Sequence, residues 1–220
     1  MKRVFSTMLT LAAVLLLLPS IVPAQVQLET EKGLMVGLNF ANFKGADSDG
    51  SKTKTGIVGG GFVRFNLSPS VAIQPELLYS MKGAKGTGFG IDFEFKLAYL
   101  EVPVLLRFTI PTEGNVVPAL FAGPAVGFNI SSKFQADAQG ISGEVDIDNA
   151  RSVDFGLVLG GAVTVGSGNA KFFIDARYNL GLTNAYEDVD SPGLFDLVDL
   201  AGNAPELKNS GFLIMVGVTF

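Results

Sequence analysis

Seven charged side chains are the residues of this sequence best placed to do chemistry, because each stands on an alternate position between apolar residues. They are Arg64, Glu76, Glu101, Arg107, Asp154, Asp175 and Arg177. Paired carboxylates act as general acid and base only with substrate access and separated pKa values, and the sequence indicates neither. Carboxylates and guanidiniums that share a buried face neutralise each other, since a lone buried charge costs several kcal/mol. We therefore expect a structural ion-pair network and no catalytic site.

Composition removes other kinds of chemistry. The chain has no cysteine and no histidine, so it lacks thiolate nucleophiles, cysteine metal ligands and the commonest general base. The net charge of −5 and the lack of a basic stripe disfavour a nucleic-acid partner. Asp47 and Asp49 hint at calcium ligation, but Gly50 is misplaced for an EF-hand loop. We predict no metal site, no cofactor and no enzymatic activity.

The charged residues alternate with large apolar residues, which is typical of β-strands with one polar and one apolar face. In the fourth such stretch the apolar phase slips by one residue near Tyr99 and Leu100, after Ile91–Leu97 have held the apolar positions. A single extra residue is what a β-bulge inserts, so we predict a bulge there. The eight expected strands are residues 34–41, 62–67, 71–82, 91–108, 120–130, 153–165, 171–183 and 212–220.

The connections between these strands alternate in length. Tight turns are expected at residues 68–70, 111–115 and 167–169, and longer polar loops at 42–55, 83–90, 132–151 and 185–210. Outer-membrane barrels have short periplasmic turns and long outer loops. The sequence therefore predicts an all-β fold, an eight-stranded antiparallel up-and-down transmembrane β-barrel with both termini on the periplasmic side.

The N-terminus carries an export signal. Lys2 and Arg3 precede a short apolar run, Met8–Leu18, and Val22–Ala24 places small residues at a cleavage site. Residues 1–24 are thus predicted to be a signal peptide and residues 25–220 the barrel domain. Later in the chain no apolar run reaches eighteen residues, which excludes a helical membrane protein. The predicted location is the outer membrane of a Gram-negative type of cell.

Alternation alone does not say which face meets the solvent. A soluble lipocalin-like periplasmic binder gives the same pattern with its apolar face inward. The apolar positions here are mostly large, glycines gather on the polar face, and that face carries both signs of charge, which favours lipid outside. Tyr79, Tyr99 and Tyr178 are interpreted as interfacial girdle residues. An eight-stranded lumen is only wide enough for side chains, so we expect the seven charged residues to plug it.

Several motifs resemble a known family. Gln74–Ser80, Tyr99–Leu105, Gly123–Phe128 and Asp175–Leu182 are similar to the third, fourth, fifth and seventh strands of the PorT-like outer-membrane β-barrel family. The resemblance implies an outer membrane of Bacteroidota-like bacteria, and the secretion role of the founding member is not transferred. The terminal Phe220 resembles the aromatic residue that barrel-assembly machinery recognises.

The predicted function is a structural or interaction role through the extracellular loops. Outer-membrane lipid, the assembly machinery and an unidentified extracellular or periplasmic partner are the expected contacts, and the barrel is expected to be a monomer. Two alternatives stay open: a narrow pore for ions or small solutes, and the soluble lipocalin-like binder. The acidic segment 185–210 is either a solvated surface or a site for cations or a basic partner. Its apolar residues suggest a short capping helix or a contact surface.

Overall fold

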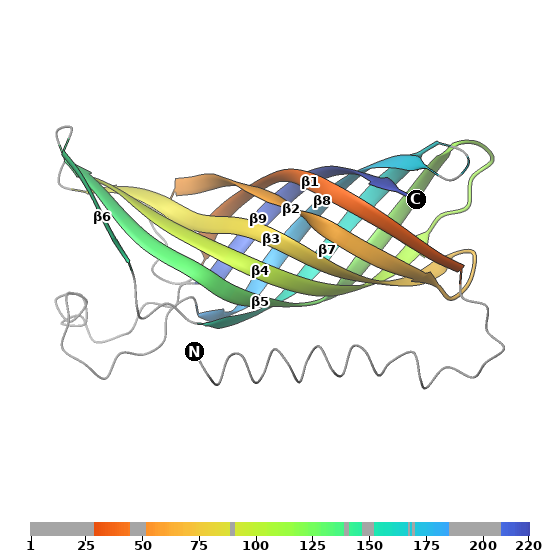
Figure 1. Cartoon of the computed structure of the whole chain (residues 1–220), viewed down its shortest axis with the longest axis horizontal. Helices are drawn as coiled ribbons and strands as arrows, with labels where there is room; N and C mark the ends of the chain where they lie inside the picture. The colour runs from red at the N-terminus through yellow and green to blue at the C-terminus, as the bar shows by residue number, and fades with distance from the viewer. Residues whose placement is uncertain are drawn as a thin grey trace.

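The computed structural model describes residues 29–44, 52–88, 91–138, 141–146, 152–166, 168, 170–184 and 208–220. These residues form nine strands that wrap obliquely around a common axis (Figure 1). Their bounds are β1 Glu29–Lys44, β2 Lys52–Asn66, β3 Val71–Gly88, β4 Ile91–Thr109, β5 Val116–Ala138, β6 Ile141–Asp146, β7 Val153–Val165, β8 Lys171–Asn184 and β9 Lys208–Thr219.

Eight of the strands close into a ring. Each pairs antiparallel with its neighbour along the chain, except that β5 pairs with β7, and β1 pairs with β9 to close the sheet. In that last pairing Val36 lies opposite Val216 and Phe40 opposite Phe212. Closure gives every barrel strand a partner on both sides, which a sheet in lipid requires. The predicted eight-stranded antiparallel barrel is confirmed.

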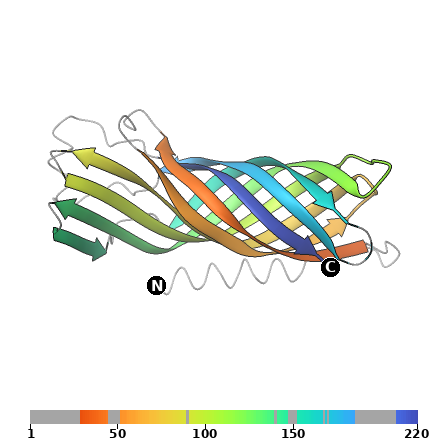
Figure 2. The same ribbon diagram turned by 90° about the horizontal axis from the view of Figure 1, so that it is seen from above.

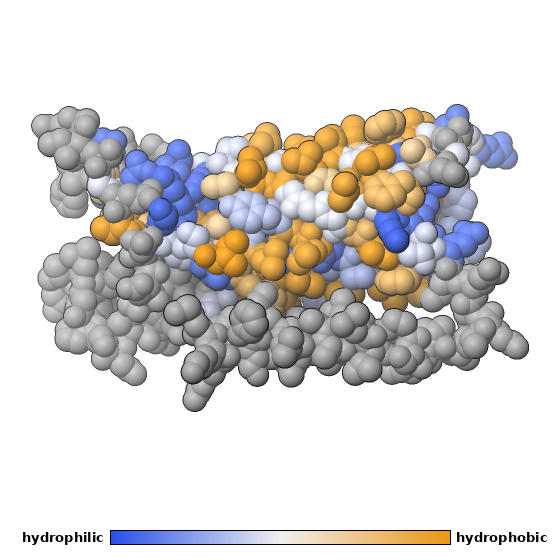
Figure 3. Space-filling view, in the orientation of Figure 1, coloured by the Kyte–Doolittle hydropathy of each residue, from blue (hydrophilic) through white to orange (hydrophobic). Residues whose placement is uncertain are grey.

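The outer surface of the ring is apolar. The exposed residues are large aliphatic and aromatic side chains, with Leu159 at 67% and Phe172 at 70%. On the face shown in Figure 3 they gather as a band over the middle of the barrel, with hydrophilic residues toward both ends. A lipocalin-like barrel has the opposite arrangement, so the soluble alternative is wrong. The band includes Leu34, Val36, Leu77, Val104, Leu106, Leu120, Leu157, Leu159, Phe172, Ile174 and Val216.

No helix among the described residues is long and apolar enough to cross a membrane.

Three tight turns join strands at one end of the barrel, as expected. In the β2–β3 turn the Ser68 hydroxyl accepts a hydrogen bond from the backbone N–H of Val71, at 3.1 Å. The β4–β5 and β7–β8 turns contain Gly114 and Gly166, with φ of 133° and 132°. That region of φ favours glycine, so these residues permit the sharp reversals.

At the other end, three barrel strands continue beyond the barrel and form a projecting sheet together with β6. We use this name for the ends of β3, β4 and β5 with β6, which extend past the other strands in two perpendicular views (Figures 1 and 2). The prediction of loops at 83–90 and 132–151 was therefore wrong for most of both ranges. Residues 83–88 are rich in glycine, which hides their strand character. Residues 132–138 and 141–146 do alternate between apolar and polar side chains, but over short stretches with few large apolar residues, and they were read as a polar loop.

The bulge expected near Tyr99 and Leu100 is present as a register shift, but the change of phase expected within β4 was wrong. Leu97, Tyr99 and Glu101 are all buried, so β4 keeps one face inward throughout. The register does shift at Ala98 and Tyr99, but the extra residue is in β5, where Ile130 has no partner on β4. The apolar and charged residues exchange faces along β4. Its first part lies in the projecting sheet, where Glu94 and Lys96 take the outer positions. Tyr99, at 0% exposure, is a lumen residue and not part of a girdle.

Three predictions fall outside the described residues. They are the signal peptide at 1–24, the weak calcium motif at 47–50 and most of the acidic segment 185–210.

Candidate functional site

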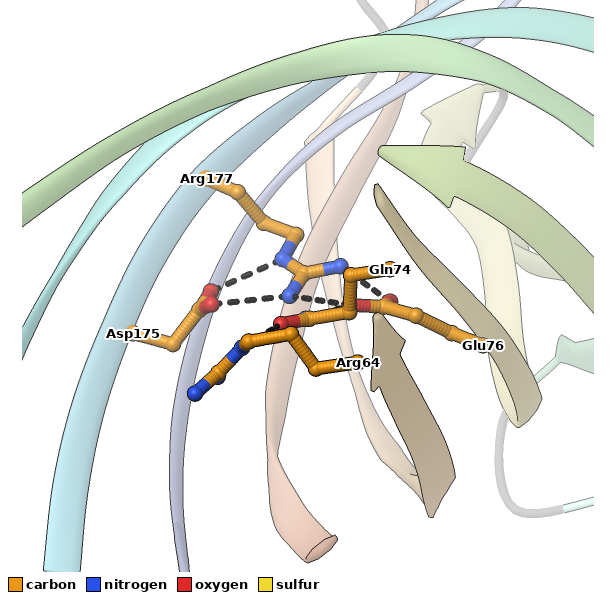
Figure 4. A network of polar contacts seen from close by, with 5 residues as sticks. All are labelled: Arg64, Gln74, Glu76, Asp175 and Arg177. Carbon is orange, nitrogen blue, oxygen red and sulfur yellow. Dashed lines mark hydrogen bonds and ion pairs between the residues drawn. The ribbon is translucent and has the colours of Figure 1, made fainter. Parts of the chain in front are cut away.

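The interior of the barrel is built around one arginine. The guanidinium of Arg177, on β8, donates to Asp175 on the same strand, with Nε–Oδ1 at 2.8 Å, and to Glu76 on β3, with Nη1–Oε2 at 2.6 Å (Figure 4). The Arg177 and Glu76 side chains are 1% and 0% exposed. Bidentate pairing with two carboxylates satisfies most donors of a guanidinium held away from water.

From Glu76 the polar contacts continue toward the turn end of the barrel. Gln74 donates to Glu76 at 2.7 Å and accepts from Nε of Arg64 at 2.9 Å. Arg64 also forms an ion pair with Glu31, which in turn accepts from Lys171 at 3.0 Å. The path runs from β8 through β3, β2 and β1 and returns to β8, so it crosses the lumen. We call these seven residues the lumen network: Glu31, Arg64, Gln74, Glu76, Lys171, Asp175 and Arg177.

A second, smaller group of polar contacts lies nearer the projecting sheet. Lys82 on β3 pairs with Glu101 on β4, and its ammonium is 4.9 Å from the ring centre of Tyr99. Asp154 on β7 lines the same small cavity as Lys82 and Glu101 and accepts a hydrogen bond from the hydroxyl of Thr183. A cation over an aromatic face adds attraction when the pair is desolvated, so Tyr99 helps to hold Lys82 in place.

Apolar side chains fill the interior beside these ionic groups. Phe62 and Phe173 meet edge to face, with ring centres 5.7 Å apart. The guanidinium of Arg177 lies 4.9 Å from the ring centre of Phe121. The lumen is thus packed with hydrocarbon as well as ion pairs. Two buried clusters contribute, namely Met35, Val58, Phe62, Leu78, Phe173, Leu213 and Met215, and Leu105, Phe121, Val158 and Ala162.

All seven charged residues singled out in the sequence are buried in the interior, but they do not form one network. Arg64, Glu76, Asp175 and Arg177 join the lumen network. Glu101 and Asp154 belong to the second group, with Lys82 and Thr183 as their partners. Arg107 is 4% exposed, and its Nε has no hydrogen-bond partner among the described residues.

The sequence interpretation missed several members of these networks. Glu31 lies before the expected start of the first strand. It is four residues from Met35 on β1, so both side chains lie on the inner face of the strand. Lys82 and Lys171 were placed on polar faces but not chosen, since each stands near the end of its expected strand. Extending the first expected strand by three residues would have found Glu31, and including the end residues of the third and seventh expected strands would have found Lys82 and Lys171.

The described residues contain no group of three or more carboxylate, histidine or cysteine side chains that could hold a metal ion.

Comparison with known proteins identifies the family. The family described as outer membrane protein beta-barrel domain matches residues 24–187, which is most of the chain. The chain belongs to this family. No curated protein matches it.

Solved structures of outer-membrane barrels are similar to this one in fold. The attachment invasion locus protein Ail of Yersinia pestis is 18% identical, with a TM-score of 0.41 over 87% of this chain and 99% of that one. Neisserial surface protein A is 12% identical, with a TM-score of 0.45 over 86% and 97%. The outer membrane protease OmpT of Escherichia coli is 8% identical, with a TM-score of 0.32 over 88% and 97%.

The C-terminal residue completes the closing pair of strands. The backbone N–H of Phe220 donates to the carbonyl of Lys32 at 2.8 Å, and its ring is on the outer face at 59% exposure. Recognition of Phe220 by the assembly machinery stays a prediction.

Proposed function

We propose that this outer-membrane barrel is closed to solutes and acts as a structural or interaction protein through the parts that lie outside the membrane. The observation that carries the proposal is the contact of Arg177 with Glu76, from β8 to β3 across the interior. A solute on the barrel axis has to break this pair, and breaking a buried pair costs about 3–5 kcal/mol. The non-catalytic role is part of the same proposal.

The packing around the network supports a closed lumen. Leu78, Leu105 and Leu213, at 1%, 0% and 0% exposure, point into the same interior from three different strands. An eight-stranded barrel is just wide enough for its own side chains. Ionic and apolar groups together leave the central section without a wide polar path.

The projecting sheet supports the interaction role. β6 pairs with β5 and with no other described strand, so one of its edges has free backbone groups. An exposed sheet edge accepts a further strand from another polypeptide. We place this sheet and its loops on the extracellular side, because the short turns at the other end are typical of the periplasmic face.

Four finer points belong to this proposal as well. They are membership of the PorT-like branch, export by cleavage after Ala24, assembly through recognition of Phe220, and a monomeric state in lipid. N-terminal sequencing of the mature chain tests the cleavage, which predicts Gln25 as the first residue.

Conductance in planar lipid bilayers tests the closed lumen. The wild-type protein should show no steady single-channel steps, whereas Arg177→Ala combined with Glu76→Ala should show them, because the two substitutions remove the side chains that cross the interior. Lys85→Ala, which removes an exposed charge from the projecting sheet, is the matched control and should stay silent. Steady steps from the wild-type protein would instead support the narrow-pore alternative.

The interaction role needs a separate test. A variant in which Ile141–Asp146 is replaced by glycine and serine residues keeps the eight barrel strands and removes β6. Partners that co-purify with the wild-type protein from native membranes should be lost with this variant. Equal recovery of the same partners with both proteins would show that β6 is not the binding edge.

A further inference from the structure

A polar cavity of about 530 Å³ opens at the turn end of the barrel. Ser68 and Pro69 of the β2–β3 turn and Gly166 of the β7–β8 turn form part of its rim. The charged side chains that line it are Glu29, Glu31, Arg64, Arg107 and Lys171. It is therefore a vestibule below the lumen network, on the side that we assign to the periplasm.

The positive charge of Arg107 is the one in this vestibule that has no carboxylate partner among the described residues. The residue is 4% exposed, and its Nε has no hydrogen-bond partner in the same part of the chain. Arg64 and Arg177 are near enough to repel it, while Asp175 and Glu31 attract it from a distance without contact. A buried guanidinium carries five donors, and leaving a buried charge unpaired costs several kcal/mol.

Nearby carboxylates already form ion pairs with other residues. Glu31 bonds to both Arg64 and Lys171, and Asp175 bonds to Arg177 through both oxygens. Glu29 lines the same vestibule but is exposed and forms no ion pair with Arg107. The lining thus holds three cations against two carboxylates, and Arg107 is the cation among them that has no carboxylate within ion-pair distance in the described part of the chain.

We propose that this vestibule is a binding site for a phosphate- or carboxylate-bearing small molecule, with Arg107 as its main anchor. The planar guanidinium matches the geometry of such an oxyanion and binds it with two parallel hydrogen bonds. Arg64 adds a second positive charge, and Thr164 and Asn66 line the cavity with neutral polar groups. The volume exceeds that of a single phosphate group, so it has room for an organic molecule attached to the anion. The site is independent of whether the lumen conducts.

Binding to the full-length protein in a zwitterionic detergent tests the proposal. Calorimetric titration with inorganic phosphate and with citrate should give saturable binding to the wild-type protein. Arg107→Gln should weaken it roughly ten- to a hundredfold, the loss expected for a charge-assisted hydrogen-bonding partner, whereas Arg107→Lys should retain part of it. A parallel series in micelles containing phosphatidylglycerol separates a soluble anion from a lipid headgroup as the source of the phosphate.

The matched control is Lys32→Gln. Lys32 stands on the exposed outer face of β1 at the same end of the barrel, so this variant loses the same charge without touching the vestibule. Its binding should equal that of the wild-type protein. A second readout needs no ligand: without anions, Arg107→Gln should unfold at the same or a higher temperature than the wild-type protein, because it removes an unpaired buried charge. Absence of binding by all three probes overturns the proposal, as does equal weakening by Lys32→Gln and Arg107→Gln.

Discussion

Arg177 and Glu76 are 101 residues apart in the chain and meet at 2.6 Å inside the barrel. Their strands, β8 and β3, are not neighbours in the sheet, so the contact spans the interior and not a ladder of adjacent strands. Asp175 and Gln74 complete the coordination of the two charges. The pair therefore ties opposite walls of the barrel together.

Removal of one partner of this pair should destabilise the barrel strongly. Arg177→Ala leaves Glu76 and Asp175 buried without their cation, and an uncompensated buried charge costs about 3–5 kcal/mol. Replacing both partners together, as Arg177→Met with Glu76→Leu, should cost much less than the two single substitutions added. The free energy of unfolding from lipid vesicles, measured by urea titration, checks both values.

The control for this prediction is the partly exposed pair of Lys85 and Glu94, at 3.5 Å on the projecting sheet. Lys85→Ala should change the free energy of unfolding by less than about 1 kcal/mol, since water screens exposed pairs. If Arg177→Ala cost no more than Lys85→Ala, the lumen network would have no structural role.

A charge placed on the outer band should impair membrane assembly. Leu157→Arg exposes a guanidinium to hydrocarbon, which costs about 2–4 kcal/mol near the bilayer midplane. Val104→Arg should behave similarly, because Val104 is also on the exposed outer face. Folding yield in vesicles and the free energy of unfolding measure the effect.

Thr55→Arg supplies the comparison. Thr55 is outward and exposed on β2, close to the start of the strand at Lys52, so we expect a change of about 0–1 kcal/mol at the membrane interface. Equal accumulation of Leu157→Arg and the wild-type protein in the outer membrane would mean that the apolar band does not face lipid.

The barrel strands could be predicted from the sequence because two different environments act on each of them. Inside the apolar band, lipid selects residues such as Leu157 and Leu159, while the lumen selects Asp154 and Val158. The result is strict alternation. In the projecting sheet the alternation is short in β5 and β6, inverted in β4 and masked by glycines in β3, so the strand continuations past Gly83 and Ser132 were read as loops.

The pairing inside the lumen could not be predicted. Alternation places Arg64, Arg107 and Arg177 on the inner face. Their positions along the barrel axis, however, depend on the register of all eight strands. That register decides that Arg177 reaches Glu76 and that Arg107 reaches no carboxylate. The wrong prediction for β4 has a related cause. When the apolar residues change from the inner to the outer face along an unbroken strand, the sequence pattern is the same as when one residue is inserted.

Glycines on the inner face should resist substitution even by alanine, which is the last prediction. At Gly217, on β9, an added Cβ would collide with the ring of Phe173 and with the backbone carbonyl of Leu34. The backbone atom cannot move without disturbing the β1–β9 pairing that closes the barrel. We expect Gly217→Ala to cost about 1–3 kcal/mol, the usual range for overpacking, in urea unfolding from vesicles. Gly143→Ala on β6 is the control: its added Cβ meets nothing within 4 Å, and a neutral or slightly stabilising effect follows from the lower entropy of the unfolded chain. Equal effects at the two glycines would contradict a tightly packed interior.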